Sequence, residues 1–183
     1  MTRSTVTTPP PDAVRPGPLP GGPAPGSPLG PHYSRCFGCG SDHPTGLHLT
    51  ATTPDGITVE AAFTVGESHQ GAPGLAHGGV LAAAMDEVIG MSVWLFRRPY
   101  VTGRLETDYL VPVPVGTELY LRAWCNGMSG RKAYLEAEGR IGSADGPVAV
   151  RAAALFIEVG MEHFERHGGQ AITDEHHEYE VNP

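Results

Sequence analysis

The stretch HGGVLAAAMDEVIGMSVWLF, residues 77–96, decides the fold of this chain. It is rich in Ala, Leu and Met, which favour helix, and it lacks the two-residue alternation of a strand. It opens on two glycines and is followed by Arg97, Arg98 and Pro99, which is typical of a helix with cations at its C-terminal end. Because it is apolar nearly all round apart from two acidic residues, the pattern predicts one long helix buried on most sides.

Strands are predicted on both sides of this helix. Apolar and polar residues alternate in ITVEAAFTV (57–65), TELYLRAWCN (117–126), KAYLEAEGRI (132–141) and VAVRAAALFIEV (148–159). Gly- and Asn-containing breaks separate the last three segments and indicate hairpins, and LHLTAT (47–52) indicates a further hairpin upstream. The predicted architecture is α+β: one long central helix wrapped by an antiparallel sheet of five or six strands.

The two ends of the chain differ in composition from its middle. Residues 1–31 hold ten of the 18 prolines and almost no large apolar side chains, so we expect a disordered segment. Residues 166–183 read as an acidic, flexible tail. Between them, residues 32–165 are expected to form a single domain with a small core.

Charge and hydropathy exclude several classes of function. A net charge of −8, with only 12 Lys and Arg, argues against nucleic acid as the main partner. No run of 18 apolar residues exists, so no membrane span is expected. The N-terminus lacks the apolar core of a secretory signal, and three cysteines do not make a disulfide framework, so we expect a cytoplasmic protein with free thiols.

Two of the cysteines, Cys36 and Cys39, form a C-x-x-C motif in a glycine-rich turn. The motif supplies only half of a zinc site, and no second C-x-x-C exists. His32 and His43 lie nearby in the sequence and would be needed to complete it. We therefore expect no bound metal and no cofactor, with both thiols packing the turn. Cys125 alternates with apolar neighbours and is expected in the core.

Asp86 and Glu87 lie in the middle of the apolar helix, where burying a carboxylate is costly unless it is paired or protonated. Both could lie on a solvated edge or pair with a cation such as Arg104. The helix, however, opens with His77 and two glycines, whose bare N–H groups favour an oxygen that gains negative charge. A base and an oxyanion donor together indicate acyl transfer or hydrolysis.

The segments CFGCG, HPTGLHL, HQGAPGLAHGGVLAAAMDEVIG, VTGRLETDYLVPVPVGTEL and SGRKAYLEAEGRI resemble the hotdog-fold thioesterases. The resemblance covers residues 36–159 and is greatest to the phenylacetate-pathway type and to the mammalian thioesterase-superfamily acyl-CoA hydrolases. It implies a hotdog fold and a homodimer, or a dimer of dimers, with active sites shared between subunits. Some family members carry an asparagine six residues before the helix-start histidine, where this sequence has Gly71.

The resemblance also implies a role for individual residues. His77 matches the family histidine at the helix start, and Gly78 matches the glycine whose N–H polarises the thioester carbonyl. Asp86 matches the carboxylate that activates water or attacks the carbonyl, with Glu87 as a rival. Thr102 matches the hydroxyl residue that helps to place the water, and it is expected from the partner subunit.

The expected activity is hydrolysis of an acyl-CoA or acyl-carrier-protein thioester to a free acid and a thiol. Gly79 is assigned to substrate binding beside Gly78. Phosphates of coenzyme A require cations, and the candidates are Arg97, Arg98, Arg131 and Lys132. Two other functions stay open: a hotdog hydratase or dehydratase acting on a thioester-linked chain, and a non-catalytic acyl-CoA-binding protein.

Overall fold

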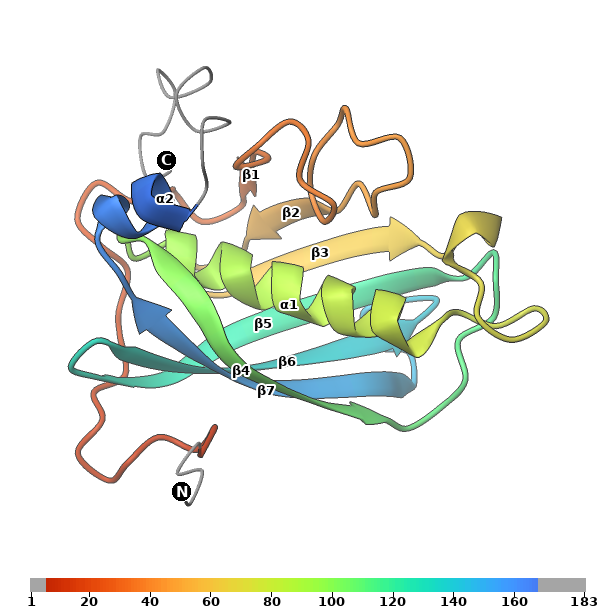
Figure 1. Ribbon diagram of the computed structural model, residues 1–183. Helices are drawn as coiled ribbons and strands as arrows, with labels where there is room; N and C mark the ends of the chain where they lie inside the picture. The colour runs from red at the N-terminus through yellow and green to blue at the C-terminus, as the bar shows by residue number, and fades with distance from the viewer. Residues whose placement is uncertain (1–5, 168–183) are drawn as a thin grey trace, which may run out of the picture.

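In the computed structural model, which describes residues 6–167, a long helix lies across one face of a curved antiparallel sheet (Figure 1). In chain order the elements are β1 (Ser27–Leu29), β2 (Thr50–Thr53), β3 (Val59–Thr64), η1 (Glu67–His69), α1 (Gly78–Trp94), β4 (Tyr100–Tyr109), β5 (Glu118–Ser129), β6 (Lys132–Ile141), β7 (Val148–Glu158) and α2 (Met161–His167). The predicted α+β architecture, a helix wrapped by a sheet, is confirmed.

Within residues 6–167 the sheet has seven strands in the order β1-β2-β3-β5-β6-β7-β4, rather than the five or six expected from the sequence. Strands β5, β6 and β7 form the predicted meander, and β6 spans residues 132–141 as expected. The additional strands, β1 and β4, are the two edges of the sheet. Neither shows a regular alternation of buried and exposed residues, which is the signal on which strand prediction depends.

Helix α1 is the centre of the core and confirms the predicted helix. It contacts strands β3 to β7. Its buried side chains recur at helical spacing and are Leu81, Ala84, Met85, Val88, Ile89, Met91, Ser92 and Val93. The one buried hydroxyl in that set, on Ser92, donates a 3.2 Å hydrogen bond to the Val88 carbonyl, which satisfies it within the helix.

Residues 6–31 follow a defined path over the domain, which differs from the disorder expected of them. Strand β1 pairs with β2, and Leu29 is buried in the core. Val14 and Met128 exchange backbone hydrogen bonds of 2.9 and 2.8 Å. This arm, residues 6–31, also lines a cavity with Tyr134, a residue that alternation assigns to the solvent face but that is only 6% exposed. The arm acquires its structure from the sheet, because its own residues supply little apolar surface.

At the other end, α2 includes Arg166 and His167, the first residues of the expected tail, and the remainder of that tail lies outside the described residues. Within the part of the chain that the structure describes, no helix is both long and apolar enough to cross a lipid bilayer.

Candidate active site

His77 caps the N-terminus of α1. Its backbone is extended, and its Nδ1 accepts a 2.9 Å hydrogen bond from the Gly79 N–H. A neutral imidazole that accepts at Nδ1 carries its proton on Nε2, so His77 presents a donor to the solvent. The Gly79 N–H is thereby engaged by the histidine rather than free for substrate. Among the described residues, no hydrogen-bond acceptor is found for the Gly78 N–H.

Tyr109 and the loop at Gly71 both contact the first residues of α1 and hold them in place. The Tyr109 hydroxyl, at the end of β4, donates a 2.9 Å hydrogen bond to the Gly78 carbonyl. A Cβ on Gly71 would come within 2.8 Å of the His77 Cα, so this loop has no room for the asparagine of other family members. Nearby Gln70 uses its Oε1 to accept from Gly74, at 2.7 Å. Tyr109 was not among the residues singled out from the sequence, and it ends a strand that lacks regular alternation.

Asp86 lies half-buried in the middle of α1, where Thr102 on β4 donates a 2.9 Å hydrogen bond to its Oδ1. Burial raises the pKa of Asp86, and the hydrogen bond from Thr102 opposes that rise. The sequence led us to expect Thr102 from the neighbouring subunit, but the structure brings the pair together within one chain. The reason is topological, because only five residues separate the end of α1 from the start of β4, which returns alongside the helix.

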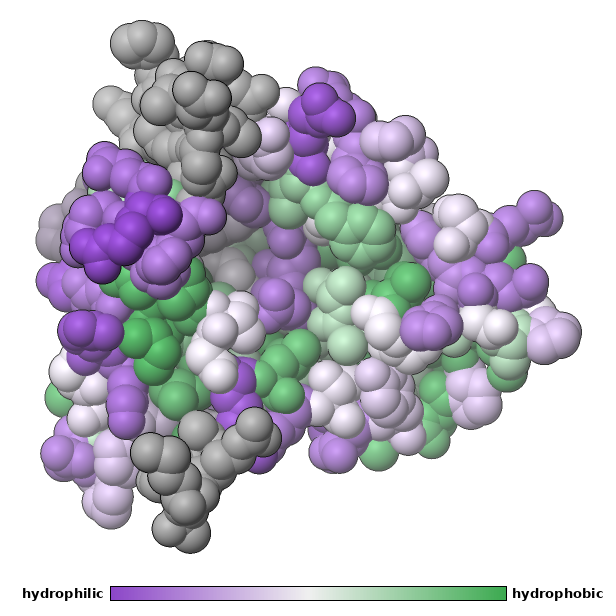
Figure 2. Space-filling model, in the orientation of Figure 1, coloured by the Kyte–Doolittle hydropathy of each residue, from purple (hydrophilic) through white to green (hydrophobic). Residues whose placement is uncertain are grey.

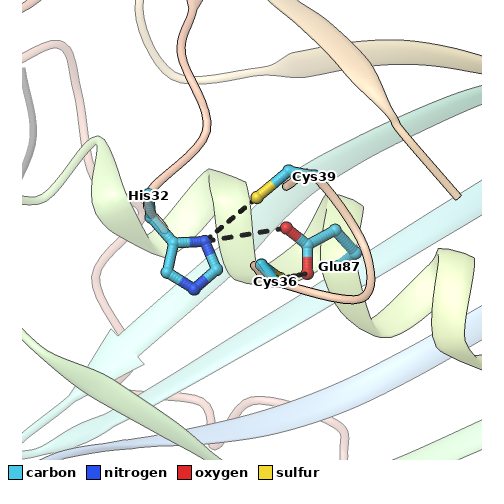
Figure 3. Close-up of side chains that lie close together, drawn as sticks. All are labelled: His32, Cys36, Cys39 and Glu87. Carbon is cyan, nitrogen blue, oxygen red and sulfur yellow. Dashed lines mark hydrogen bonds and ion pairs between the residues drawn. The ribbon is translucent and has the colours of Figure 1, made fainter. Parts of the chain in front are cut away.

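Glu87 points away from this pair. Consecutive residues of a helix are about 100° apart, and Glu87 faces the loop that carries the C-x-x-C motif instead of Thr102 (Figure 3). Arg104, the cation suggested as a partner for the helix carboxylates, forms an ion pair with Glu106 at 2.6 Å. The two adjacent carboxylates of α1 therefore belong to two different environments.

One chain does not bring all the expected catalytic groups together. Asp86 follows Gly78 by eight residues, which corresponds to about 12 Å along the helix axis at 1.5 Å per residue. A thioester carbonyl polarised by the Gly78 N–H is therefore out of reach of a water molecule held by Asp86 of the same chain.

The four cations expected at the coenzyme A phosphates gather at the far end of α1 and on the β5–β6 hairpin (Figure 1). Arg98 pairs with Glu158 at 3.2 Å, and Arg97 donates to the Gly21 carbonyl. The Glu158 N–H in turn donates to the Arg131 carbonyl. Lys132 lines the cavity of about 320 Å³ beneath the arm. All four lie apart from His77 and Gly78.

The C-x-x-C loop folds onto α1. Cys36, Cys39 and Glu87 meet His32, from the segment after β1, with their ligand atoms all within 4.8 Å of one another (Figure 3). His43 takes no part in this group and instead accepts from the Thr45 N–H. Of the two histidines expected beside the motif, the structure brings His32 to it, and the fourth member of the group is Glu87, 48 residues after Cys39. Cys125 lies in the core as expected.

Burial and hydrogen bonding together set the pKa values of this group. Burial raises the pKa of Glu87 to about 7 and lowers the pKa of His32, which keeps the imidazole neutral at pH 7. Hydrogen bonding with the Cys39 thiol lowers the pKa of Cys36 to about 5, and the same interaction raises the pKa of Cys39.

The middle of the chain is similar to known proteins. Residues 73–146 match the model of the thioesterase superfamily. An acyl-coenzyme A thioesterase of Xenopus laevis, THEM4, is 29% identical over 97 residues, which are 53% of this chain and 43% of that protein. This chain thus spans less than half the length of the curated relative that it matches.

Solved structures agree on the fold. A thioesterase superfamily protein is 29% identical with a TM-score of 0.60, covering 67% of this chain and 62% of that one. The PaaI protein of the phenylacetic acid degradation operon of E. coli is 16% identical with a TM-score of 0.58, covering 62% of this chain and 81% of that one. The resemblance inferred from the sequence is confirmed: this chain has a hotdog fold, and its residues 73–146 match the model of the thioesterase superfamily.

Proposed function

We propose that this protein is a hydrolase of acyl-CoA thioesters. The observation that carries the proposal is the pair formed by Asp86 and Thr102, a hydrogen-bonded carboxylate on the half-buried face of an apolar helix that begins with His77 and Gly78. A carboxylate next to a positioning hydroxyl can accept a proton from water. The name of the Xenopus relative, an acyl-coenzyme A thioesterase, supports coenzyme A as the carrier of the acyl group.

In the proposed reaction Asp86 acts as the general base. Thr102 occupies Oδ1, and Oδ2 is left to accept a proton from water. The water oxygen forms a bond to the carbonyl carbon, and the carbonyl oxygen takes up negative charge against the Gly78 N–H of a second copy of the chain. Collapse of this intermediate breaks the carbon–sulfur bond. The proton held by Asp86 passes to the departing thiolate, giving a free acid and free coenzyme A.

A second copy of the chain completes the site. The gap of about 12 Å along the helix between Gly78 and Asp86 closes if two α1 helices lie antiparallel, because each Gly78 then approaches the partner's carboxylate. The outward face of α1 allows close approach, since its residues around Asp86 are small: Gly79, Ala82, Ala83 and Gly90. A Cβ placed on Gly90 would meet nothing within 4 Å.

The surface beside α1 also suits a partner copy. Strand β4 is an edge of the sheet over ten residues, and a long uncovered edge strand favours association. Three large apolar residues at its end are exposed, namely Tyr109, Leu110 and Val111. The surface over α1 and β4 carries hydrophobic residues (green) and intermediate ones (pale) among hydrophilic ones (purple), so it is not continuously hydrophilic (Figure 2). A homodimer is the smallest assembly that this proposal requires. A dimer of dimers would contain two such pairs.

The test is hydrolysis of a panel of short, long and aromatic acyl-CoAs, followed by the release of free thiol. Turnover of at least one substrate by the wild-type protein, and its loss in Asp86→Asn, is the expected result. An acyl-carrier-protein thioester is included, because the same chemistry applies to both carriers. Binding of acyl-CoA without thiol release would contradict the proposal.

A further inference from the structure

The group formed by His32, Cys36, Cys39 and Glu87 joins three separate parts of the chain. His32 follows β1, the two cysteines lie in the loop before β2, and Glu87 projects from the middle of α1 (Figure 3). All four side chains converge, although hydrophobic packing of the loop requires none of their polar atoms to meet.

Three distances between the donor atoms are close to the edges of a tetrahedral site, and all four donors lie within 4.8 Å of one another. His32 Nδ1 lies 3.2 Å from Cys39 Sγ and 3.8 Å from Glu87 Oε1, and Cys36 Sγ lies 3.5 Å from Glu87 Oε2. Bonds of about 2.0–2.3 Å from zinc to N, O and S donors give a tetrahedron with edges of about 3.3–3.8 Å. The observed edges therefore require only small movements of side chains to hold one ion.

The burial of the Glu87 carboxylate is not explained by its hydrogen bonds. Its side chain is only 13% exposed, and its Oε1 is buried without a hydrogen-bond partner among the described residues. An orphaned carboxylate oxygen is costly in a protein interior, and a metal ion would satisfy it. The loop is shaped around this carboxylate, since a Cβ on Gly38 would lie 2.3 Å from Glu87.

The backbone of the loop orients the sulfur atoms. The Gly38 N–H donates to Cys36 Sγ at 3.3 Å, and the Gly40 N–H donates to the Cys36 carbonyl at 2.9 Å. A Cβ on Gly40 would meet the backbone of Ser34 and Cys36 at 2.4–2.6 Å, so the turn can close only with glycine there. The His32 ring is held against Trp94, with ring centroids 4.3 Å apart.

We propose that His32, Cys36, Cys39 and Glu87 bind one zinc ion. Two sulfurs, one imidazole and one carboxylate in a tetrahedral arrangement suit zinc among the common ions. Four protein donors leave no open position for water, so the site is structural and takes no part in hydrolysis. The ion fastens the arm and the C-x-x-C loop to α1, one residue from Asp86. The site does not depend on the thioesterase activity and is tested separately.

The first measurement is the metal content of the full chain, purified without a metal-affinity step, by elemental mass spectrometry. About one zinc per chain is expected, and none in Cys36→Ser/Cys39→Ser. Cys125→Ser is the matched control and should retain zinc, because Cys125 lies elsewhere in the core. Exchange with Co²⁺ should give the visible bands of a tetrahedral ion and a sulfur-to-cobalt charge-transfer band.

A second set of variants keeps the test valid if the double serine variant fails to fold. His32→Ala and Glu87→Gln should each weaken zinc binding, in competition with a chelator, by about tenfold or more. His43→Ala, which removes a histidine of the same loop that lies outside the group, should bind as the wild type does. Zinc below about 0.1 per chain after incubation with Zn²⁺, or equal zinc in all variants, would overturn the proposal. A Cys36–Cys39 disulfide in the native protein, detected by thiol counting, would do the same.

Discussion

Thr102 Oγ1 donates a 2.9 Å hydrogen bond to Asp86 Oδ1 within a single chain. Base and positioning hydroxyl are therefore a unit that each subunit builds for itself, from a helix and the edge strand that follows it. The helix start at His77 and Gly78 is a second unit, separated from the first by about 12 Å along the axis.

Replacing Asp86 by Asn should lower kcat by about 10²–10⁴-fold, because the side chain keeps its shape but loses its basicity. Circular dichroism and Tm should stay close to those of the wild type. Asp108→Asn is the matched control, since Asp108 is an exposed residue of the same sheet edge and should leave turnover unchanged. Equal activity of the two variants would mean that Asp86 is not the base.

Replacing Thr102 by Ala should reduce kcat less than Asp86→Asn does, because a positioning hydroxyl contributes less than the base that it orients. Thr102→Ser, which keeps the hydroxyl, should restore most of the rate. Steady-state kinetics of the three variants on one acyl-CoA measure these differences in kcat. If the serine variant is as impaired as the alanine variant, the role of Thr102 is packing rather than hydrogen bonding.

Mixing variants tests whether the site is shared. Chains carrying Asp86→Asn and chains carrying His77→Ala, unfolded and refolded together, should recover up to about a quarter of the wild-type activity, since half of the dimers are mixed and each contains one intact site. The mixture of Asp86→Asn with Thr102→Ala should gain nothing beyond the residual activity of its parts, because neither chain then carries an intact pair. Recovery in the second mixture alone would show that Asp86 and Thr102 act from different subunits.

The arm should contribute to stability. Leu29→Ala removes a core side chain that is 8% exposed and should destabilise the fold by about 2 kcal/mol, or about 4–8 °C in Tm. Leu19→Ala, at a leucine of the same arm that is 38% exposed, is the control and should change Tm little. Thermal unfolding followed by calorimetry measures both. Identical Tm values for the two variants would support the disorder expected from composition.

The sequence by itself determined the long central helix and the β5–β6–β7 meander, because both depend on local signals. The helix is marked by residues that favour helix without a two-residue alternation, and the strands are marked by that alternation. The sequence also singled out Asp86, since a carboxylate in an apolar helix requires an explanation. The same stretch of sequence contains His77 and Gly78 at the start of the helix.

The tertiary structure decided what depends on distant contacts. Strands β1 and β4 are sheet edges without alternation, and their place follows from pairing with β2 and β7. The distance between Gly78 and Asp86, the pairing of Thr102 with Asp86 in one chain, and the meeting of Glu87 with the C-x-x-C loop are spatial relationships. Residues 48 to 51 positions apart become neighbours only when α1 is covered by that loop, because periodicity reports which face a residue occupies and not which segment covers that face.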